Sequence, residues 1–241
     1  MKLTILHEDN HIIAVEKEAG VLSQGDSSGD PSLLDLVRDY IKAAYNKPGR
    51  VFLGLVHRLD RPVSGIMVFA RTSKAAERLS REFAGRGVVK MYIALVEKKG
   101  ALPSDEWVEC EDDLVGKRGY SEKAGSGSRN VRTAKLRYRL IDSNERYALV
   151  LVHLLTGRKH QIRAQLSMRG MPIVGDETYG TAEKLPDGSI CLHAVYLGFR
   201  HPVKEKPVEL FSEVPGRIAE KIEMGDTVRE RIITLCRGSG G

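Results

Sequence analysis

The chain has 241 residues, of which 41% are hydrophobic and 29% are charged, an ordinary balance for a folded protein with a substantial core. The three cysteines, Cys110, Cys191 and Cys236, are far apart and form no CxxC pair, which argues against a disulfide scaffold or a zinc knuckle. No apolar run approaches the roughly 20 residues of a membrane helix, and charges come too early at the N-terminus for a secretory signal. We therefore expect a cytoplasmic protein with no membrane partner.

The first half of the chain mixes strand-like and helix-like segments. Apolar runs predict strands over residues 11–17, 51–59 and 65–70. Helical periodicity predicts helices over residues 30–45 and 73–85, with Ser32 at the start of the first and Gly85 at the end of the second.

The second half is richer in strands. We expect strands over residues 88–97, 131–142, 147–155, 191–202 and 207–213, a surface loop over 116–130 and a short helix over 158–170. Strands in groups, broken by helices, favour an α+β fold with a mainly antiparallel sheet in a single domain. We expect this domain to span residues 1–236 and residues 237–241 to form a disordered tail.

Basic residues gather in two segments of this moderately basic chain, whose formal net charge is +6. From Lys117 to Arg139 there are eight Lys or Arg residues and one acid, and strand alternation puts Lys135, Arg137 and Arg139 on one face. From Thr156 to Met171 there are four basic residues and no acid. Such clusters suit a phosphate backbone, but composition alone fits a solvated charged face equally well.

The segment LVHRLDRPVSGIMVFA, residues 55–70, places an aspartate between arginines in apolar sequence. Asp60 follows Arg58 by two residues, and Arg61 stands at the turn itself. A nucleophilic carboxylate has to be ionised and aimed, and positive neighbours at a strand end meet both needs. Taken alone, the same motif more often indicates an aspartate that caps a turn and pairs with an arginine for stability.

The segment HRLDRPVSGIMVFARTSKAA resembles the catalytic motif of the RluA-type RNA pseudouridine synthases. The resemblance continues in order through the opening ILHEDNHIIAVEKEAGVLSQ and then VVKMYIALV, TGRKHQIRAQL, PIVGDETYG and LHAVYLGFRHP, and it covers about residues 3–212. Two positions depart from the family pattern. Val63 stands where the family commonly has threonine, and Glu18 follows Lys17 where the family commonly has proline.

This resemblance implies the pseudouridine synthase catalytic fold and the isomerisation of a uridine in tRNA or rRNA. Asp60 would be the nucleophile, Tyr92 would stack on the uracil, and Arg163 would pair with the catalytic aspartate. The uridine would flip out of its stack, and Arg58 would occupy the vacated space. No cofactor or metal is implied.

We expect phosphate and RNA contacts from a further group of basic residues, namely Arg61, Lys117, Arg118, Lys135, Arg137, Arg139, Arg158 and Lys159. Many relatives carry an extra N-terminal RNA-binding domain, and we expect none here because the first predicted strand begins almost at Met1. We expect a monomer whose partner is structured RNA.

Two other readings stay open at this point. The chain could be an RNA-binding or ribosome-assembly protein that keeps the fold without needing turnover. It could also be a hydrolase that uses Asp60 and His57 as an acid–base pair, in which case a free base or a cut strand would be released.

Overall fold

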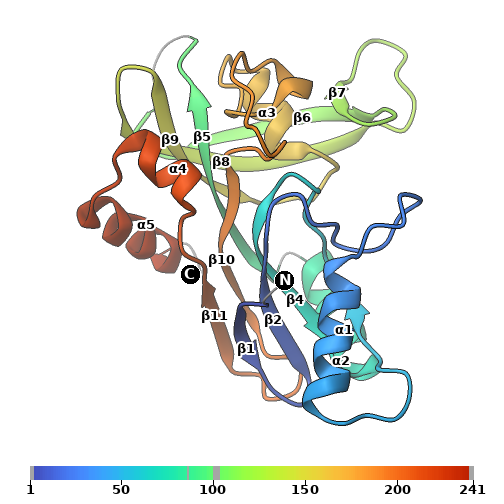
Figure 1. Ribbon diagram of the computed structural model, residues 1–241. Helices are drawn as coiled ribbons and strands as arrows, with labels where there is room; N and C mark the ends of the chain where they lie inside the picture. Colours follow the sequence, from blue (N-terminus) through green and yellow to red (C-terminus); the bar gives the residue numbers. More distant parts are fainter. Residues whose placement is uncertain (1–2, 86, 100–103, 239–241) are drawn as a thin grey trace. The chain divides into compact units, whose positions relative to one another are not determined.

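The computed structural model describes residues 3–85, 87–99 and 104–238, and most of its elements are labelled in Figure 1. Contacts divide the chain into two compact units, one made of residues 1–88 and 194–212 and the other of residues 89–193 and 213–241. Within the described ranges, no helix has the length and apolar character that crossing a membrane requires.

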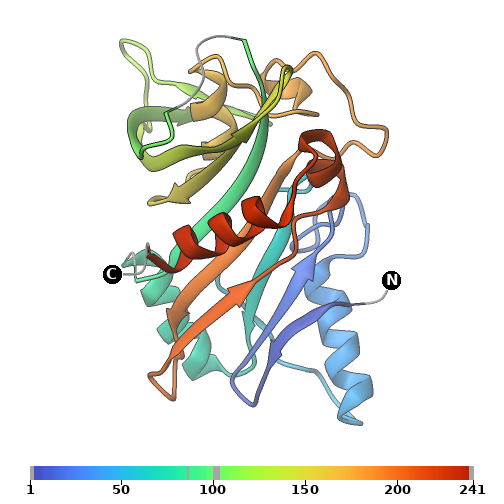
Figure 2. The same cartoon turned by 90° about the vertical axis from the view of Figure 1, so that its left-hand side faces the viewer.

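The first unit is built on a sheet whose strand order is β1-β2-β4-β10, with β3 paired to β4 and β11 paired to β10. Its elements are β1 (Ile5–Glu8), β2 (Ile12–Lys17), α1 (Leu33–Ala44), β3 (Gly54–Leu55), β4 (Ser64–Ala70), α2 (Ser73–Ala84), β10 (Leu192–Arg200, in this unit from residue 194) and β11 (Pro207–Phe211). The β10–β11 pair is an antiparallel hairpin, drawn in orange in Figure 2.

The helices of the first unit form where the sequence predicts them, and their ends show why. Ser32 precedes α1 as its N-cap, where its Oγ accepts the Asp35 N–H at 3.3 Å and donates to the Asp35 carboxylate at 2.6 Å. In α2, Ala75 and Leu79 are fully buried and pack against the apolar side chains of β2 and β4. Amphipathic packing therefore fixes α2 against the strand that follows the aspartate motif.

Gly65 lets β4 approach β10 more closely than any other residue would. Its φ is +123°, and a Cβ at this position would lie 2.4 Å from the backbone nitrogen and oxygen of Ala194. Because only glycine has no Cβ, the Ser-Gly step after the aspartate motif is a packing requirement of the sheet.

The second unit contains an antiparallel sheet of strand order β5-β9-β8-β6-β7. Its elements are β5 (Val89–Glu97), β6 (Val108–Gly116), β7 (Ser121–Lys123), β8 (Arg132–Ser143), β9 (Tyr147–Leu154), α3 (Gln161–Ser167), the 3-10 turn η1 (Glu177–Tyr179), α4 (Gly216–Ala219), the 3-10 turn η2 (Glu220–Ile222) and α5 (Asp226–Gly238). The predicted α+β class with a mainly antiparallel sheet and flanking helices is confirmed.

The structure differs from the sequence-based prediction at several segments. The strand expected over residues 51–59 is only β3, and the loop expected over 116–130 contains β7. The helix expected over 158–170 begins only at residue 161, because His160 has a left-handed φ of 50° that a helix cannot contain. Residues 237 and 238 lie in α5 and so are not a disordered tail, while residues 239–241 lie outside the described residues. The expected catalytic domain over residues 1–236 stays a prediction.

Candidate functional site

Asp60 lies in the turn that connects β3 to β4. Its two neighbours on the N-terminal side alternate in burial, with Arg58 exposed and Leu59 buried, and Asp60 itself is half-buried. The Val63 N–H donates to the Asp60 carbonyl oxygen at 3.0 Å and closes the turn. The sequence thus places this carboxylate at a fixed bend that leaves it partly open to solvent.

The residue before Asp60 is held by a buried serine. Ser23 Oγ donates to the Leu59 carbonyl at 2.6 Å and accepts the Leu59 N–H at 3.1 Å. One hydroxyl therefore satisfies both backbone groups of a buried residue, for which an unpaired group would cost about 1–3 kcal/mol. Sequence reasoning missed Ser23, although it stands within the opening segment that carries the family resemblance.

The residue after Asp60 is held by a buried lysine. Lys17 has no exposed surface, and its Nζ donates to the carbonyls of Glu18 at 3.0 Å, Val21 at 2.7 Å and Arg61 at 3.1 Å. The Gly20 N–H donates to the same Arg61 carbonyl at 2.8 Å. A charge buried this deeply requires such partners. Both sequence neighbours of Asp60 are consequently fixed by the segment 17–23.

The two arginines of the motif have different surroundings. Arg61 donates through Nε to the Gly20 carbonyl at 3.0 Å and forms an ion pair with Asp30 at 2.7 Å. Arg58 is exposed, and the described residues give it no ion-pair partner. Of the two guanidinium groups, Arg58 is thus the one whose charge is not used within the fold.

His57 serves the fold of the first unit. Its Nε2 accepts the Val68 N–H of β4 at 3.0 Å, and its ring stacks on Phe83 with the centroids 4.6 Å apart. A ring nitrogen that accepts a backbone N–H carries no proton of its own. This contact supports a structural role over the acid–base role that the hydrolase reading requires.

In the second unit, Arg163 forms a buried bidentate ion pair with Asp176. Its Nε and Nη2 lie 2.6 and 2.8 Å from the two carboxylate oxygens, and the side chains are only 6% and 1% exposed. The guanidinium also lies over the Tyr179 ring, 5.1 Å from its centroid. Sequence reasoning did not identify Asp176 as a partner, although an acid inside the apolar PIVGDETYG segment is a signal of a buried pair.

Tyr92 and Arg163 lie on the same side of the second unit's sheet. Tyr92 of β5 and Tyr138 of β8 stand opposite the same β9 residue, so their side chains share a face. Ala134, on that face of β8, packs against Ala164 of α3, the helix that carries Arg163. The register thus brings the predicted tyrosine and arginine to one face.

The basic face of β8 points to the other side. Lys135 forms an ion pair with Glu111 at 2.7 Å, and the guanidinium groups of Arg137 and Arg139 lie 4.9 and 5.8 Å from the centroid of the Trp107 ring. Alternation along β8 is as predicted, but it turns these three cations away from the face of Tyr92. These interactions give each of the three side chains a partner within the fold. They do not test whether the same side chains contact RNA.

Four other predicted RNA-binding residues lie near the start of α3. We call Lys117, Arg118, Arg158 and Lys159 the α3 entry cluster, and all four are exposed. Lys159 Nζ donates to the Lys117 carbonyl at 3.3 Å, and Arg158 Nε donates to the Thr133 carbonyl at 3.0 Å. Within the cluster only Lys117 has a carboxylate partner, Glu122 at 3.2 Å, in the part of the chain that the structure describes. The cluster therefore presents mostly unpaired positive charge.

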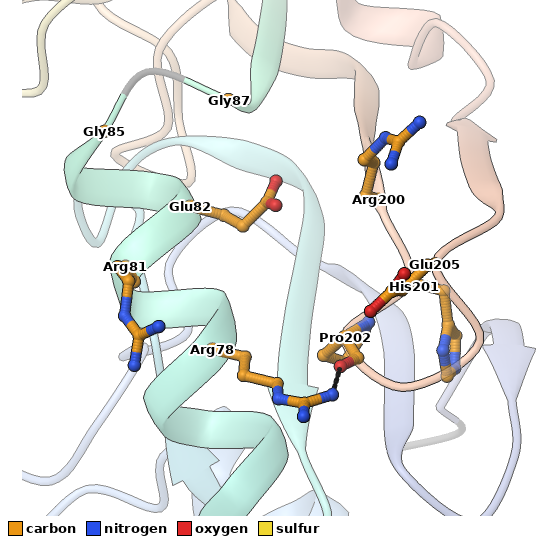
Figure 3. Close-up of a pocket in the computed structure, with 9 residues that line it drawn as sticks. All are labelled: Arg78, Arg81, Glu82, Gly85, Gly87, Arg200, His201, Pro202 and Glu205. Atoms are coloured by element: carbon orange, nitrogen blue, oxygen red, sulfur yellow. Dashed lines mark hydrogen bonds between the residues drawn. The ribbon is translucent and has the colours of Figure 1, made fainter.

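A hollow of about 620 Å³ in the first unit lies between α2 and the turn after β10. Figure 3 shows Arg78 reaching the Pro202 carbonyl, a hydrogen bond of 2.6 Å. Arg81 is paired with Glu77 at 2.7 Å, and Glu82 also lines the hollow. Arg78 and Arg81 thus each have a partner within the fold, and none of the predicted site residues lines this hollow, so it adds no candidate site. Residues 3–85, 87–99 and 104–238 also hold no group of three or more His, Cys, Asp or Glu side chains arranged for a metal ion.

Comparison with known proteins bears directly on these motifs. Residues 11–168 match the family model described as RNA pseudouridylate synthase. The chain is 34% identical over 229 residues to ribosomal large subunit pseudouridine synthase D of Xanthomonas campestris, covering 88% of this chain and 66% of that protein. It is 35% identical to the protein of the same name from Xylella fastidiosa, covering 90% and 68%. The chain thus spans about two thirds of these relatives' length.

A solved structure gives the same answer for the fold. Human RNA pseudouridylate synthase domain containing 4 superposes with a TM-score of 0.75 at 25% identity, covering 91% of this chain and 92% of that one. The chain therefore belongs to the RNA pseudouridylate synthase family, and by class it is an isomerase that acts on RNA. The resemblance to pseudouridine synthases that the sequence motifs indicate is confirmed.

Proposed function

We propose that this chain converts uridine to pseudouridine in the RNA of the large ribosomal subunit, with Asp60 as the nucleophile. The observation that carries the proposal is the turn at Asp60, which lies inside the matched family region and is fixed from both sides by Ser23 and Lys17. A fixed, half-buried carboxylate meets the geometric requirement of nucleophilic catalysis.

The reaction needs only a rearrangement of bonds within the substrate. The bond from uracil N1 to the anomeric carbon breaks, a bond from uracil C5 to that carbon forms, and the proton on C5 is replaced by one on N1. Asp60 supplies a carboxylate oxygen as the nucleophile. Tyr92 stacks on the uracil, and its hydroxyl helps to remove the C5 proton. As the family resemblance implies, we assign to Arg163 the role of keeping the catalytic carboxylate ionised, a role for which the geometry of a guanidinium group is suited.

For RNA contacts we assign different weights to the predicted cations. Arg58 and the α3 entry cluster have charges that the fold leaves mostly unpaired, so they are the proposed contacts to the RNA, Arg58 as the residue that fills the space of the flipped base. Arg61, Lys135, Arg137 and Arg139 already have partners within the fold and would contribute less.

The choice of large-subunit ribosomal RNA over tRNA rests on the names of the relatives above. We further propose that the protein acts as a monomer in the cytoplasm. The competing reading as an RNA-binding protein without turnover predicts no pseudouridine at all.

The direct test is chemical mapping of pseudouridine across all stable RNAs of cells that lack the gene, together with treatment of that RNA by the purified protein. We expect one or more large-subunit sites to vanish and to return on treatment, with the mass of the RNA unchanged. If the lost site lay in tRNA, the proposed substrate would be wrong. A cut strand or a released base would support the hydrolase hypothesis instead.

A further inference from the structure

A hollow of about 680 Å³ lies in the first unit between the C-terminal half of α1 and the segment that leads into β3. Its lining includes Arg38 and Lys42 of α1, and Arg50 and Phe52 of the following segment. The family motifs quoted above include none of these residues. We call Lys42, Arg50 and Phe52 the Phe52 surface.

The charge around this hollow is mostly uncompensated. Lys42 and Arg50 are exposed, and no carboxylate in the described ranges lies within ion-pair distance of either. Arg38 has an exposed pairing with Asp35 at 3.3 Å, the kind that contributes about 1 kcal/mol or less. Asp39 is the one acid that lines the hollow. A polyanion would therefore be attracted here more strongly than a neutral or acidic partner.

An aromatic ring stands beside these cations. Phe52 is 51% exposed, although the next residue, Leu53, is buried. Its ring tip lies 3.5 Å from where a Cβ would stand on Gly54 of β3, so the ring rests along that strand. The backbone thus presents a large apolar face to solvent from an anchored position. This arrangement leaves the Phe52 ring outside the core.

Exposed aromatic rings between cations are the feature with which proteins bind unpaired nucleotides. A base stacks on the ring, and the phosphates on either side contact the cations. The lining of the hollow suits a short stretch of single strand better than a single phosphate, since it offers both a ring and separate charges.

We propose that the Phe52 surface binds an unpaired stretch of the substrate RNA, with one base stacked on Phe52 and phosphates on Lys42 and Arg50. The proposal deepens the proposed function, because it rests on RNA being the substrate. It adds a single-stranded segment as a recognition feature, which the motif at Asp60 does not supply.

The first test is equilibrium binding of a ten-nucleotide oligoadenosine, which contains no uridine and cannot react, to the full chain. Phe52→Ala and Phe52→Leu should each weaken binding about tenfold, since leucine keeps apolar area but has no π-face, whereas Phe52→Trp should bind as well as the wild type. Wild-type affinity of Phe52→Leu would overturn the proposal.

The second test separates the charges from the ring. The double variant Lys42→Gln, Arg50→Gln should make the negative slope of log affinity against log salt less steep by about 1.4, or about 0.7 for each lost phosphate contact on a single strand. Lys74→Gln, which removes an exposed cation on α2, should leave the slope unchanged. An equal change in slope per removed charge in the two variants would contradict the proposal, because bulk charge would then account for binding.

Kinetics distinguish this proposal from the proposed function. In Phe52→Ala the KM for the large-subunit RNA should rise about tenfold with kcat unchanged. Weaker RNA binding by the Phe52 variants without any pseudouridine formation would overturn the proposed function and support this surface. Pseudouridine formation at the wild-type KM in every variant would overturn only the proposal that the Phe52 surface binds RNA.

A binding measurement with a polyglutamate peptide tests for a protein partner instead. If the Phe52 variants lost affinity for this peptide but kept their affinity for RNA, the surface would bind a protein and the proposal would be overturned.

Discussion

The carboxylate of Asp60 is positioned through its neighbours in sequence. Leu59 is bound twice by Ser23, and the Arg61 carbonyl accepts from Lys17 and from the Gly20 N–H. The Asp60 side chain is therefore attached to a backbone segment that hydrogen bonds from residues 17–23 fix on both sides. Fixing a reacting group before the substrate arrives lowers the entropic part of the barrier.

Ser23→Ala tests this positioning at the residue scale. The change leaves the buried N–H and carbonyl of Leu59 without their partner, so we expect a loss of about 1–3 kcal/mol in the free energy of unfolding and a fall in kcat of about tenfold with little change in KM. Urea unfolding and steady-state kinetics measure the two effects. Ser28→Ala, in the exposed loop nearby, is the control and should change neither. An unchanged kcat in a destabilised Ser23→Ala protein would contradict the positioning role.

The Arg163–Asp176 pair gives a second prediction. Removal of either member breaks a buried bidentate ion pair, so Asp176→Asn and Arg163→Met should each destabilise the protein by about 3–5 kcal/mol. Because both changes break the same ion pair, the double variant should lose less than the sum of the two. A double-mutant cycle from urea unfolding gives the coupling. Additive losses would show that the two side chains do not act as a pair.

At the scale of elements, β4 depends on the close approach of Gly65 to Ala194. A Cβ there would overlap backbone atoms at 2.4 Å in a left-handed conformation, so Gly65→Ala should cost more than about 3 kcal/mol of stability. Gly29→Ala is the matched control, since Gly29 also has a positive φ of +79° but open space around its Cα, and it should cost about 1 kcal/mol. Thermal unfolding of both variants compares them. Similar losses would mean that φ alone, and not the approach of two strands, requires Gly65.

Elements with local signals were predictable from the sequence, and those set by long-range contacts were not. Ser32 and the spacing after it indicate α1, and apolar runs indicate β4, β5 and β9. The strand at 51–59 is short because the backbone of Leu59 and Arg61 is bound by the side chains of Ser23 and Lys17, which no local pattern shows. Helix α5 was missed, although Ile232 and Cys236 bury one side of it at helical spacing.

The candidate site divides in the same way. The motif around Asp60 and the tyrosine and arginine motifs can be read from sequence because the family resemblance carries them. Ser23 and Asp176 were missed, since each acts through a hydrogen bond to a residue that is not its neighbour in sequence, although Asp176 stands out as an acid in an apolar segment. The face of Lys135, Arg137 and Arg139 followed from alternation, but its orientation relative to Tyr92 depends on strand register, which sequence does not reveal.

At the scale of the whole molecule, two buried histidines should make the free energy of unfolding fall in mild acid. Burial, aided by the positive charges of Arg137 and Lys90, lowers the pKa of His153 to about 4, and burial lowers the pKa of His193 to about 3. Both groups have pKa values near 6.5 when unfolded. Their contribution is thus complete above pH 6.5 and is lost as the pH falls below it, because the unfolded chain binds the protons first.

We expect the free energy of unfolding to drop by on the order of 2 kcal/mol per histidine between pH 7 and pH 5. Urea titrations at the two pH values measure the drop, and His153→Gln should reduce it by roughly half. Equal stability of the wild type at pH 7 and pH 5 would contradict the prediction.

We propose that one carboxylate, that of Asp60, performs the isomerisation. This role is tested most directly by the yield of pseudouridine in a large-subunit RNA transcript after treatment with Asp60→Asn protein, with Asp26→Asn, which changes an exposed carboxylate in the loop before α1, as the control. We expect no detectable pseudouridine from Asp60→Asn, even with the fold and RNA affinity intact, and a wild-type yield from Asp26→Asn. A wild-type yield from folded Asp60→Asn protein would contradict it.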